Sequence, residues 1–111
     1  MKYEIKSSLR KISGEIDDKY LQKYAVNENE EKFFEIVYSE LGEGVCLIRL
    51  ADGTLDVSYS GYPIGKIKLQ GRKHSMQILK GKYGVKSIEG TVEDFIPFVL
   101  EWKKYADWVC K

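Results

Sequence analysis

The sequence predicts an α+β fold, a two-layer domain in which helices pack on one face of a four-stranded antiparallel β-meander, in the order α-α-β-β-β-β-α. Residues 46–78 alternate apolar and polar side chains, with turn signals between the runs. Residues 28–41 and 91–109 instead repeat apolar side chains every three to four positions, as amphipathic helices do. A length of 111 residues suits a single domain over residues 1–111.

The first hairpin of the sheet is predicted at residues 52–53, where Asp-Gly between apolar runs favours a two-residue type I′ turn. This turn pairs Leu50 with Leu55 on one side of the pleat and Arg49 with Asp56 on the other. A one-residue slip would turn every side chain of the strand to the wrong face, so the apolar pattern fixes the register.

Two further turns complete the predicted meander. A three-residue loop at 61–63 pairs Leu55 with Leu69 and leaves the proline outside the ladder. A four-residue loop at 71–74 then pairs Leu69 with Met76. One face is expected to be apolar: Cys46, Ile48, Leu50, Leu55, Val57, Tyr59, Ile67, Leu69, Met76 and Ile78. The other is expected to face water: Arg49, Asp56, Ser58, Lys66, Lys68, Gln70, Ser75 and Gln77.

The clearest predicted helix spans residues 91–109. Thr91 and Asp94 have the spacing of a capping box. Pro97 either kinks this helix or lies in its first turn, if the helix begins near Glu93.

A second helix is predicted over residues 28–41, with Asn27 or Asn29 as its cap and the glycine-rich run 42–44 as its end. Its outer face is acidic: Glu28, Glu30, Glu31, Glu35 and Glu40.

The first third of the chain is expected to form helices broken near residues 13–14. Residues 2–9 also alternate well enough to form a strand. The apolar positions that favour the helices are Ile5, Leu9, Ile12, Ile16, Tyr20 and Tyr24.

Positive charge is concentrated in one part of this nearly neutral chain, whose net charge is +1. Residues 57–88 contain no Asp or Glu but seven Lys or Arg residues. Such segregation favours an anionic partner. We therefore expect residues 64–86 to bind an anionic partner, foremost the backbone of nucleic acid, in a salt-sensitive and largely sequence-independent way. The expected binding residues are Lys66, Lys68, Arg72, Lys73, His74, Lys80, Lys82 and Lys86, with Tyr62 and Tyr83 as possible stacking platforms.

A protein-interaction module is the alternative prediction: an inhibitor, an antitoxin-like partner or a self-associating subunit such as a homodimer. The acidic helix 28–40 could pair with the basic segment of a second copy, and the basic segment could bind an acidic protein surface. The aromatic C-terminal helix, with Trp102, Tyr105 and Trp108, supplies residue types enriched in interfaces.

The sequence contains few residues in arrangements suited to catalysis. His74 is the only histidine, and the two cysteines, Cys46 and Cys110, lack metal-ligand spacing. A metal-dependent nuclease would need a second carboxylate two positions before Lys68, where Lys66 stands, so the pattern that begins at Asp56 is incomplete. No phosphate-binding or dinucleotide-binding glycine motif occurs, so no cofactor and no metal are expected.

The N-terminal residues lack the apolar core of a secretion signal, and no apolar run approaches the roughly 18 residues that cross a bilayer. These features, with two cysteines expected to be reduced, predict a cytoplasmic protein that does not contact a membrane.

Overall fold

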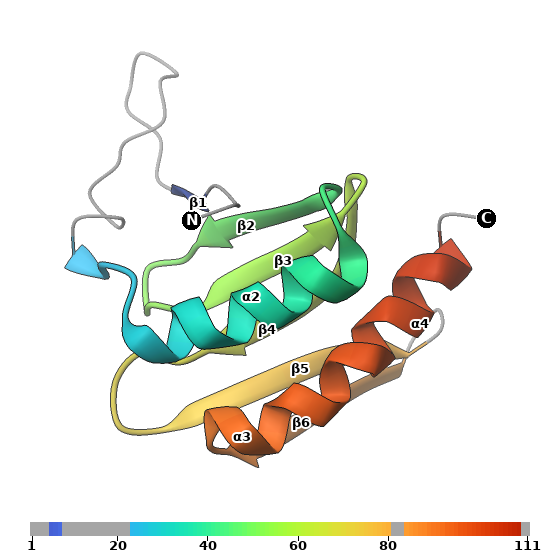
Figure 1. Ribbon diagram of the computed structural model, residues 1–111. Coiled ribbons are helices and arrows are strands. Elements are labelled where there is room, and N and C mark those ends of the chain that lie inside the picture. Colours follow the sequence, from blue (N-terminus) through green and yellow to red (C-terminus); the bar gives the residue numbers. More distant parts are fainter. Residues whose placement is uncertain (1–4, 8–22, 81–83, 110–111) are drawn as a thin grey trace.

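The computed structural model describes residues 5–7, 23–80 and 84–109. Within them, six strands form one sheet in chain order, and the helices lie together on one of its faces (Figure 1). The class is α+β, as predicted. The elements are β1 (Ile5–Ser7), α2 (Glu28–Leu41), β2 (Val45–Arg49), β3 (Leu55–Tyr59), β4 (Tyr62–Lys68), β5 (His74–Lys80), β6 (Gly84–Gly90), α3 (Val92–Phe95), a 3₁₀ turn (Ile96–Phe98) and α4 (Val99–Val109).

The hydrophobic core lies between the helices and the sheet. Phe33 of α2 meets the ring of Trp102 of α4 edge to face, with centroids 5.5 Å apart, so the two helices share one aromatic cluster. The Trp102 indole also donates a hydrogen bond of 3.0 Å to the carbonyl oxygen of Gln77 in β5. Gly65 makes room for this contact, because a Cβ there would lie 2.1 Å from that oxygen and 2.4 Å from Trp102 Nε1.

Helix α2 has the predicted bounds, and Asn27 is its cap. The Asn27 side chain accepts from the backbone N–H of Glu30 at 2.8 Å, and the Glu30 carboxylate accepts from the backbone N–H of Asn27 at 3.3 Å. This reciprocal pair is a capping box. Gly42 ends the helix at φ +83°, in the region that favours glycine.

The C-terminal helix also begins where predicted. The backbone N–H and the hydroxyl of Thr91 both donate to the Asp94 carboxylate, at 2.8 and 3.1 Å. Pro97 lies in the 3₁₀ turn that joins α3 to α4, so it interrupts the helix rather than standing in its first turn.

The number of strands was wrong. Five strands, β2 to β6, form the antiparallel meander, and β1 adds a sixth that pairs parallel to β2. Strand β6 lies between residues 79 and 90, for which no helix or strand was predicted. Residues 5–7 are therefore strand rather than helix, and the helices predicted for 8–22 lie outside the described residues.

Strand β2 turns toward the helices the side chains that were predicted to face water. The loop holds three residues, 51–53, because the backbone N–H of Leu50 donates to the Thr54 carbonyl oxygen across it at 2.8 Å and Gly53 has φ +90°. One extra loop residue shifts the register by one, so Arg49 pairs with Leu55 rather than with Asp56. Arg49 is consequently buried on the helix side, whereas Cys46 is exposed and Ile48 half-buried on the other side.

The next two pairings are shifted by two residues, which preserves the faces. Ser60 and Gly61 both have positive φ and form a two-residue turn, as in type I′ hairpins. A β-bulge on β4, where Ile64 is the extra residue opposite Val57 and Ser58, then restores the apolar alignment. Leu55 lies opposite Ile67 instead of Leu69, and Ile67 lies opposite Met76. Pro63 is part of the ladder, opposite Ser58, contrary to the prediction.

Candidate nucleic-acid interface

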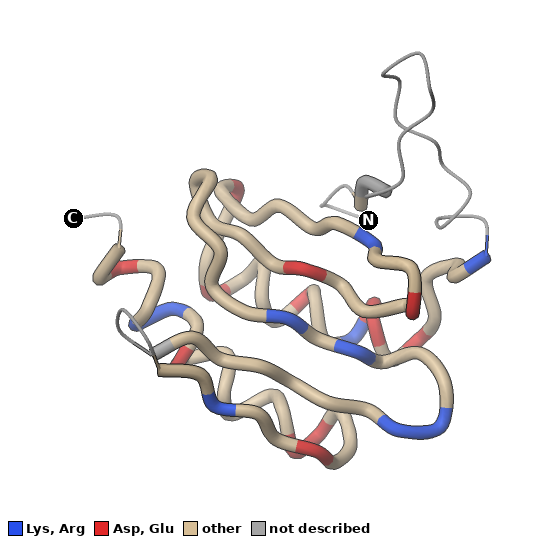
Figure 2. The backbone as a smooth tube through the Cα atoms, turned by 180° about the vertical axis from the view of Figure 1, so that it is seen from behind, with Lys and Arg blue, Asp and Glu red and all other residues tan. Residues whose placement is uncertain are grey.

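No described helix covers the face of the sheet opposite the helices (Figure 2). Besides the apolar side chains of Cys46, Ile48, Leu79 and Val85, this face carries polar and charged side chains. Two rows of side chains cross it. In the first, Asp56, Lys66, Gln77 and Ser87 lie opposite one another on β3 to β6. In the second, Lys68, Ser75 and Glu89 lie opposite one another on β4 to β6. Lys66 is exposed and Lys68 half-buried, so both lysines lie on the open face, as the alternation predicted.

This face contains a shallow hollow of about 310 Å³. Its lining combines cations, hydroxyl groups, an amide and one carboxylate. The residues are Thr54, Lys66, Ile67, Lys68, Ser75, Met76, Gln77, Ser87, Ile88 and Glu89. Hydroxyl and amide groups both donate and accept hydrogen bonds, so the hollow suits a polar ligand that carries negative charge near β4.

Arg72 and Lys73 are exposed on the loop between β4 and β5, at one end of this face. Gly71 adopts φ +79°, and a Cβ there would meet nothing within 4 Å. The His74 Nε2 atom lies 3.1 Å from the Gly71 carbonyl oxygen, so the imidazole holds the loop rather than projecting freely from it. Lys68 precedes the loop, so Arg72 and Lys73 extend the basic surface that Lys66 and Lys68 form on the sheet.

Lys86, another of the predicted binding residues, does not lie on the open face. Lys86 is on the helix side of β6, opposite Ile78, with its Nζ 4.8 Å from the centroid of the Phe98 ring. Lys80 is the last residue of β5, and Lys82 and Tyr83 lie outside the described residues. Tyr62 is half-exposed beside the β3–β4 turn. Gln70, predicted for the open face, instead points to the N-terminus of α2.

Carboxylates that flank the basic segment in the sequence fold back onto the same surface. Asp56 lies opposite Lys66, and Glu89 lies two strands from Lys68. The backbone N–H of Thr54, which donates to the Asp52 carboxylate at 3.0 Å, holds the pKa of Asp52 below its ordinary value, and the positive charge of Lys68 lowers it further. The interface is therefore less basic than a count along the chain indicates.

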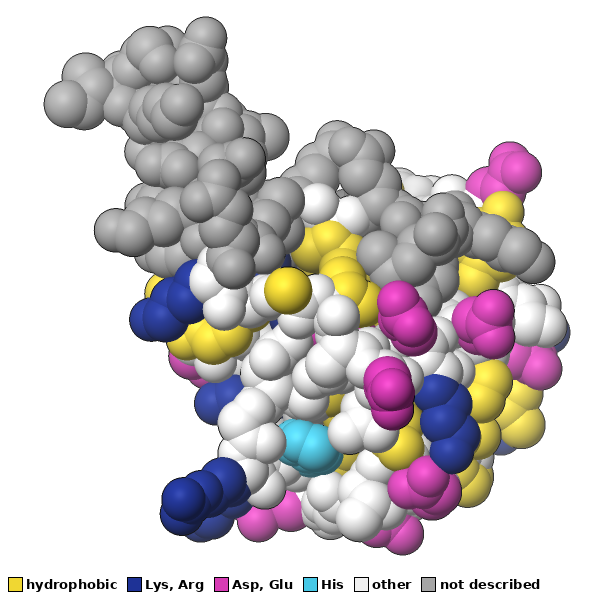
Figure 3. All heavy atoms as spheres, turned by 60° about the vertical axis from the view of Figure 1, so that its left-hand side comes forward, with side chains coloured by type: hydrophobic (Ala, Val, Ile, Leu, Met, Phe, Trp, Pro, Cys, Tyr) yellow, Lys and Arg dark blue, Asp and Glu magenta, His cyan; other side chains and the backbone are white. Residues whose placement is uncertain are grey.

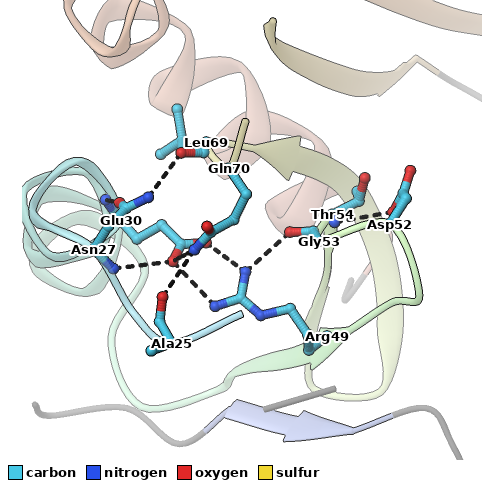
Figure 4. A network of polar contacts seen from close by, with 9 residues as sticks. All are labelled: Ala25, Asn27, Glu30, Arg49, Asp52, Gly53, Thr54, Leu69 and Gln70. Carbon is cyan, nitrogen blue, oxygen red and sulfur yellow. Dashed lines mark hydrogen bonds and ion pairs between the residues drawn. The ribbon is translucent and has the colours of Figure 1, made fainter. Parts of the chain in front are cut away.

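A buried polar cluster anchors the basic loop (Figure 4). Arg49 is 0% exposed and Glu30 1% exposed. Arg49 donates to both carboxylate oxygens of Glu30, at 2.5 and 3.0 Å, and to the Gly53 carbonyl oxygen at 2.9 Å. Gln70, at the base of the loop, donates to Glu30 at 2.8 Å, and Asn27 donates to the Leu69 carbonyl oxygen at 2.9 Å. The first turn of α2 is thus tied both to β2 and to the β4–β5 loop.

Arg49 was predicted to face solvent and Glu30 to lie on the outer face of the helix, so this cluster was not predicted. The only local signal was the capping-box spacing of Asn27 and Glu30, which requires the Glu30 carboxylate to turn back toward the helix start. Within the described residues, Arg49 Nε is buried without a hydrogen-bond partner. Such an atom costs free energy, which the bidentate pair has to offset.

The helix layer is acidic on its outer surface. The exposed carboxylates of α2 and α3 are Glu28, Glu31, Glu35, Glu40, Glu93 and Asp94. Lys32 joins the two helices through a 2.7 Å ion pair with Glu93, and this hydrogen bond lowers the pKa of Glu93. From the side, basic side chains lie mainly at the left edge of the molecule and acidic ones mainly over its right half (Figure 3).

In the part of the chain that the structure describes, no group of three His, Cys, Asp or Glu side chains is placed to hold a metal ion. Asp56, the first acid of the incomplete nuclease pattern, has a lysine directly opposite it. None of the helices in the described ranges has the length and apolar character needed to cross a membrane. Comparison of the chain with known protein families, with characterised proteins and with solved structures found no match.

Proposed function

We propose that this protein is a non-catalytic, cytoplasmic nucleic-acid-binding protein that grips the phosphate backbone through its open sheet face and the β4–β5 loop. One observation carries the proposal: Lys66 and Lys68 lie on the uncovered face, and Arg72 and Lys73 are exposed at its end. The acidic outer surface of α2 supports binding on the sheet side rather than the helix side, because it repels a polyanion. The exposed free thiol of Cys46 agrees with a reducing compartment.

Salt dependence tests this proposal quantitatively. If all four cations contact phosphates of a single strand, log K should fall with log salt with a slope of about −3, at roughly 0.7 per contact. The probe is a fluorescent mixed-sequence single-stranded 20-mer, titrated between 50 and 200 mM salt.

Replacing Lys68, Arg72 and Lys73 by Gln should reduce the magnitude of the slope by about 2, since three contacts are lost. The matched control replaces Lys32, Lys103 and Lys104 of the helix layer by Gln, which changes the net charge equally. Equal weakening in the two triple variants would show that only net charge matters and would refute an interface on the sheet.

An interaction with another protein is the second candidate. Leu100 and Trp108 of α4 are 52% and 50% exposed, and the Trp108 ring lies 5.7 Å from that of Tyr105. Half-exposed aromatic and aliphatic side chains on one helix are typical of interface anchors. Sedimentation analysis of the protein and of its Leu100→Ser/Trp108→Ser variant tests the homodimer form. A sedimentation coefficient that depends on concentration only in the unmodified protein would support it, and monomers in both would refute it.

A further inference from the structure

The hollow on the open face is divided by charge in a way that simple phosphate binding does not explain. Lys66 and Lys68 occupy its β4 side, and Glu89 occupies its β6 side. Neighbouring strands are about 4.8 Å apart and β5 lies between β4 and β6, so the backbones at Lys68 and Glu89 are roughly 10 Å apart. A phosphate that lies near the lysines is favoured, whereas one near Glu89 is repelled.

The Glu89 carboxylate is available for a ligand. Among the described residues it forms no salt bridge, and it is exposed at the rim of the hollow. An ionised carboxylate only accepts hydrogen bonds, through two oxygens side by side. A ligand that satisfies both oxygens at once presents two neighbouring donors about one nucleotide's width from its negative charge.

Guanine has this pattern. Its Watson–Crick edge carries the N1–H and N2–H₂ donors next to each other, which match the two oxygens of a carboxylate. Cytosine and adenine offer one exocyclic amino group, and uracil offers only its N3–H between two carbonyl oxygens. The edge of guanine is free in a single strand and occupied in a duplex, so the hollow suits an unpaired base.

Building on the proposed function, we infer that the hollow holds one guanine nucleotide of a single strand, with its phosphate on Lys66 and Lys68 and its base edge on Glu89. Ser75 and Gln77 of β5 lie between these two groups, where the sugar would lie, and Ser87 lies beside Glu89 on β6. Lys66 and Lys68 then supply affinity for any sequence, and Glu89 supplies the preference for guanine.

The test compares two single-stranded RNA 12-mers, one of uridine only and one in which three separated uridines are replaced by guanosine. The protein should bind the guanosine-containing strand about fivefold tighter or more. Glu89→Gln should remove most of this preference, because the amide replaces one acceptor by a donor. Lys68→Gln should weaken binding of both strands by the same factor. The matched control, Glu35→Gln on the outer face of α2, changes the net charge as Glu89→Gln does and should keep the preference.

Several results would overturn the inference while leaving the proposed function intact. These are equal affinity for the two strands, an unchanged preference in Glu89→Gln, or tighter binding of the same guanosines within a duplex. If no oligonucleotide binds at 50 mM salt, both the proposed function and the inference are refuted.

Discussion

Removing the buried guanidinium of Arg49 should be among the most destabilising single changes in the described part of the protein. In Arg49→Met the Glu30 carboxylate keeps the Gln70 and Asn27 donors but loses both bonds to Arg49, and the Gly53 carbonyl oxygen loses its donor. Breaking a fully buried ion pair from one side costs about 3–5 kcal/mol. The stability of an average domain is only about 5–15 kcal/mol, so the variant should be marginally stable.

A double-mutant cycle separates the ion pair from the rest of the site. Glu30→Leu/Arg49→Met removes both charges, and its loss of stability should be smaller than that of Arg49→Met, since no unpaired charge remains buried. The free energy of unfolding is measured by urea titration, followed by the fluorescence of the buried Trp102. Arg49→Lys, which keeps the charge but not the bidentate geometry, provides a milder variant if Arg49→Met does not fold.

Two results would refute this reasoning. One is a loss below about 1 kcal/mol in Arg49→Met, the ordinary net value of a single hydrogen bond. The other is additivity of the two single changes in the cycle, which would mean that the buried charges do not interact.

Four further substitutions test other parts of the structure by the same urea titration. Gly65→Ala should reduce the free energy of unfolding by about 3 kcal/mol or more, because the new Cβ would overlap a backbone oxygen of β5. In Gly71→Ala the new Cβ meets no neighbour, so the loss should be only the roughly 1–2 kcal/mol that a positive φ costs. Equal losses in the two variants would contradict this packing. Asn27→Ala should cost about 1–2 kcal/mol through loss of the α2 cap, and a negligible loss would show that the capping box does not stabilise the fold. Asp52→Asn should be less stable than the unmodified protein near neutral pH, because the folded-state pKa of Asp52 lies below its ordinary value of 3.8. This difference should shrink below pH 3.8 and vanish once the pH has fallen through the folded-state pKa. A difference that persists below that pKa would exclude the charge as its cause.

The parts of the fold that depend on neighbouring residues were predictable. The bounds of α2 and the start of the C-terminal helix follow from capping boxes and from apolar spacing of three and four. The position of Lys66 and Lys68 on an uncovered face follows from the alternation of β4 and β5, which two-residue errors of register leave unchanged.

The orientation of β2 was not predictable from its own residues, because both of its faces carry apolar side chains. One additional loop residue, at φ +90° in Gly53, decides which face is buried. The buried position of Arg49 depends on Glu30, 19 positions earlier in the chain, whose carboxylate compensates the charge.

The sequence alone therefore determined α2, the start of the C-terminal helix, the α+β class and the two unlike faces of the central strands, since these arise from local periodicity and capping. Only the tertiary structure decided the strand register, the buried ion pair and the charge of the open face. Asp56 and Glu89 stand at the two ends of the basic segment in the chain but share one surface with Lys66 and Lys68 in the sheet. Electrostatic interactions depend on distance in space, and the pairing of the strands sets that distance.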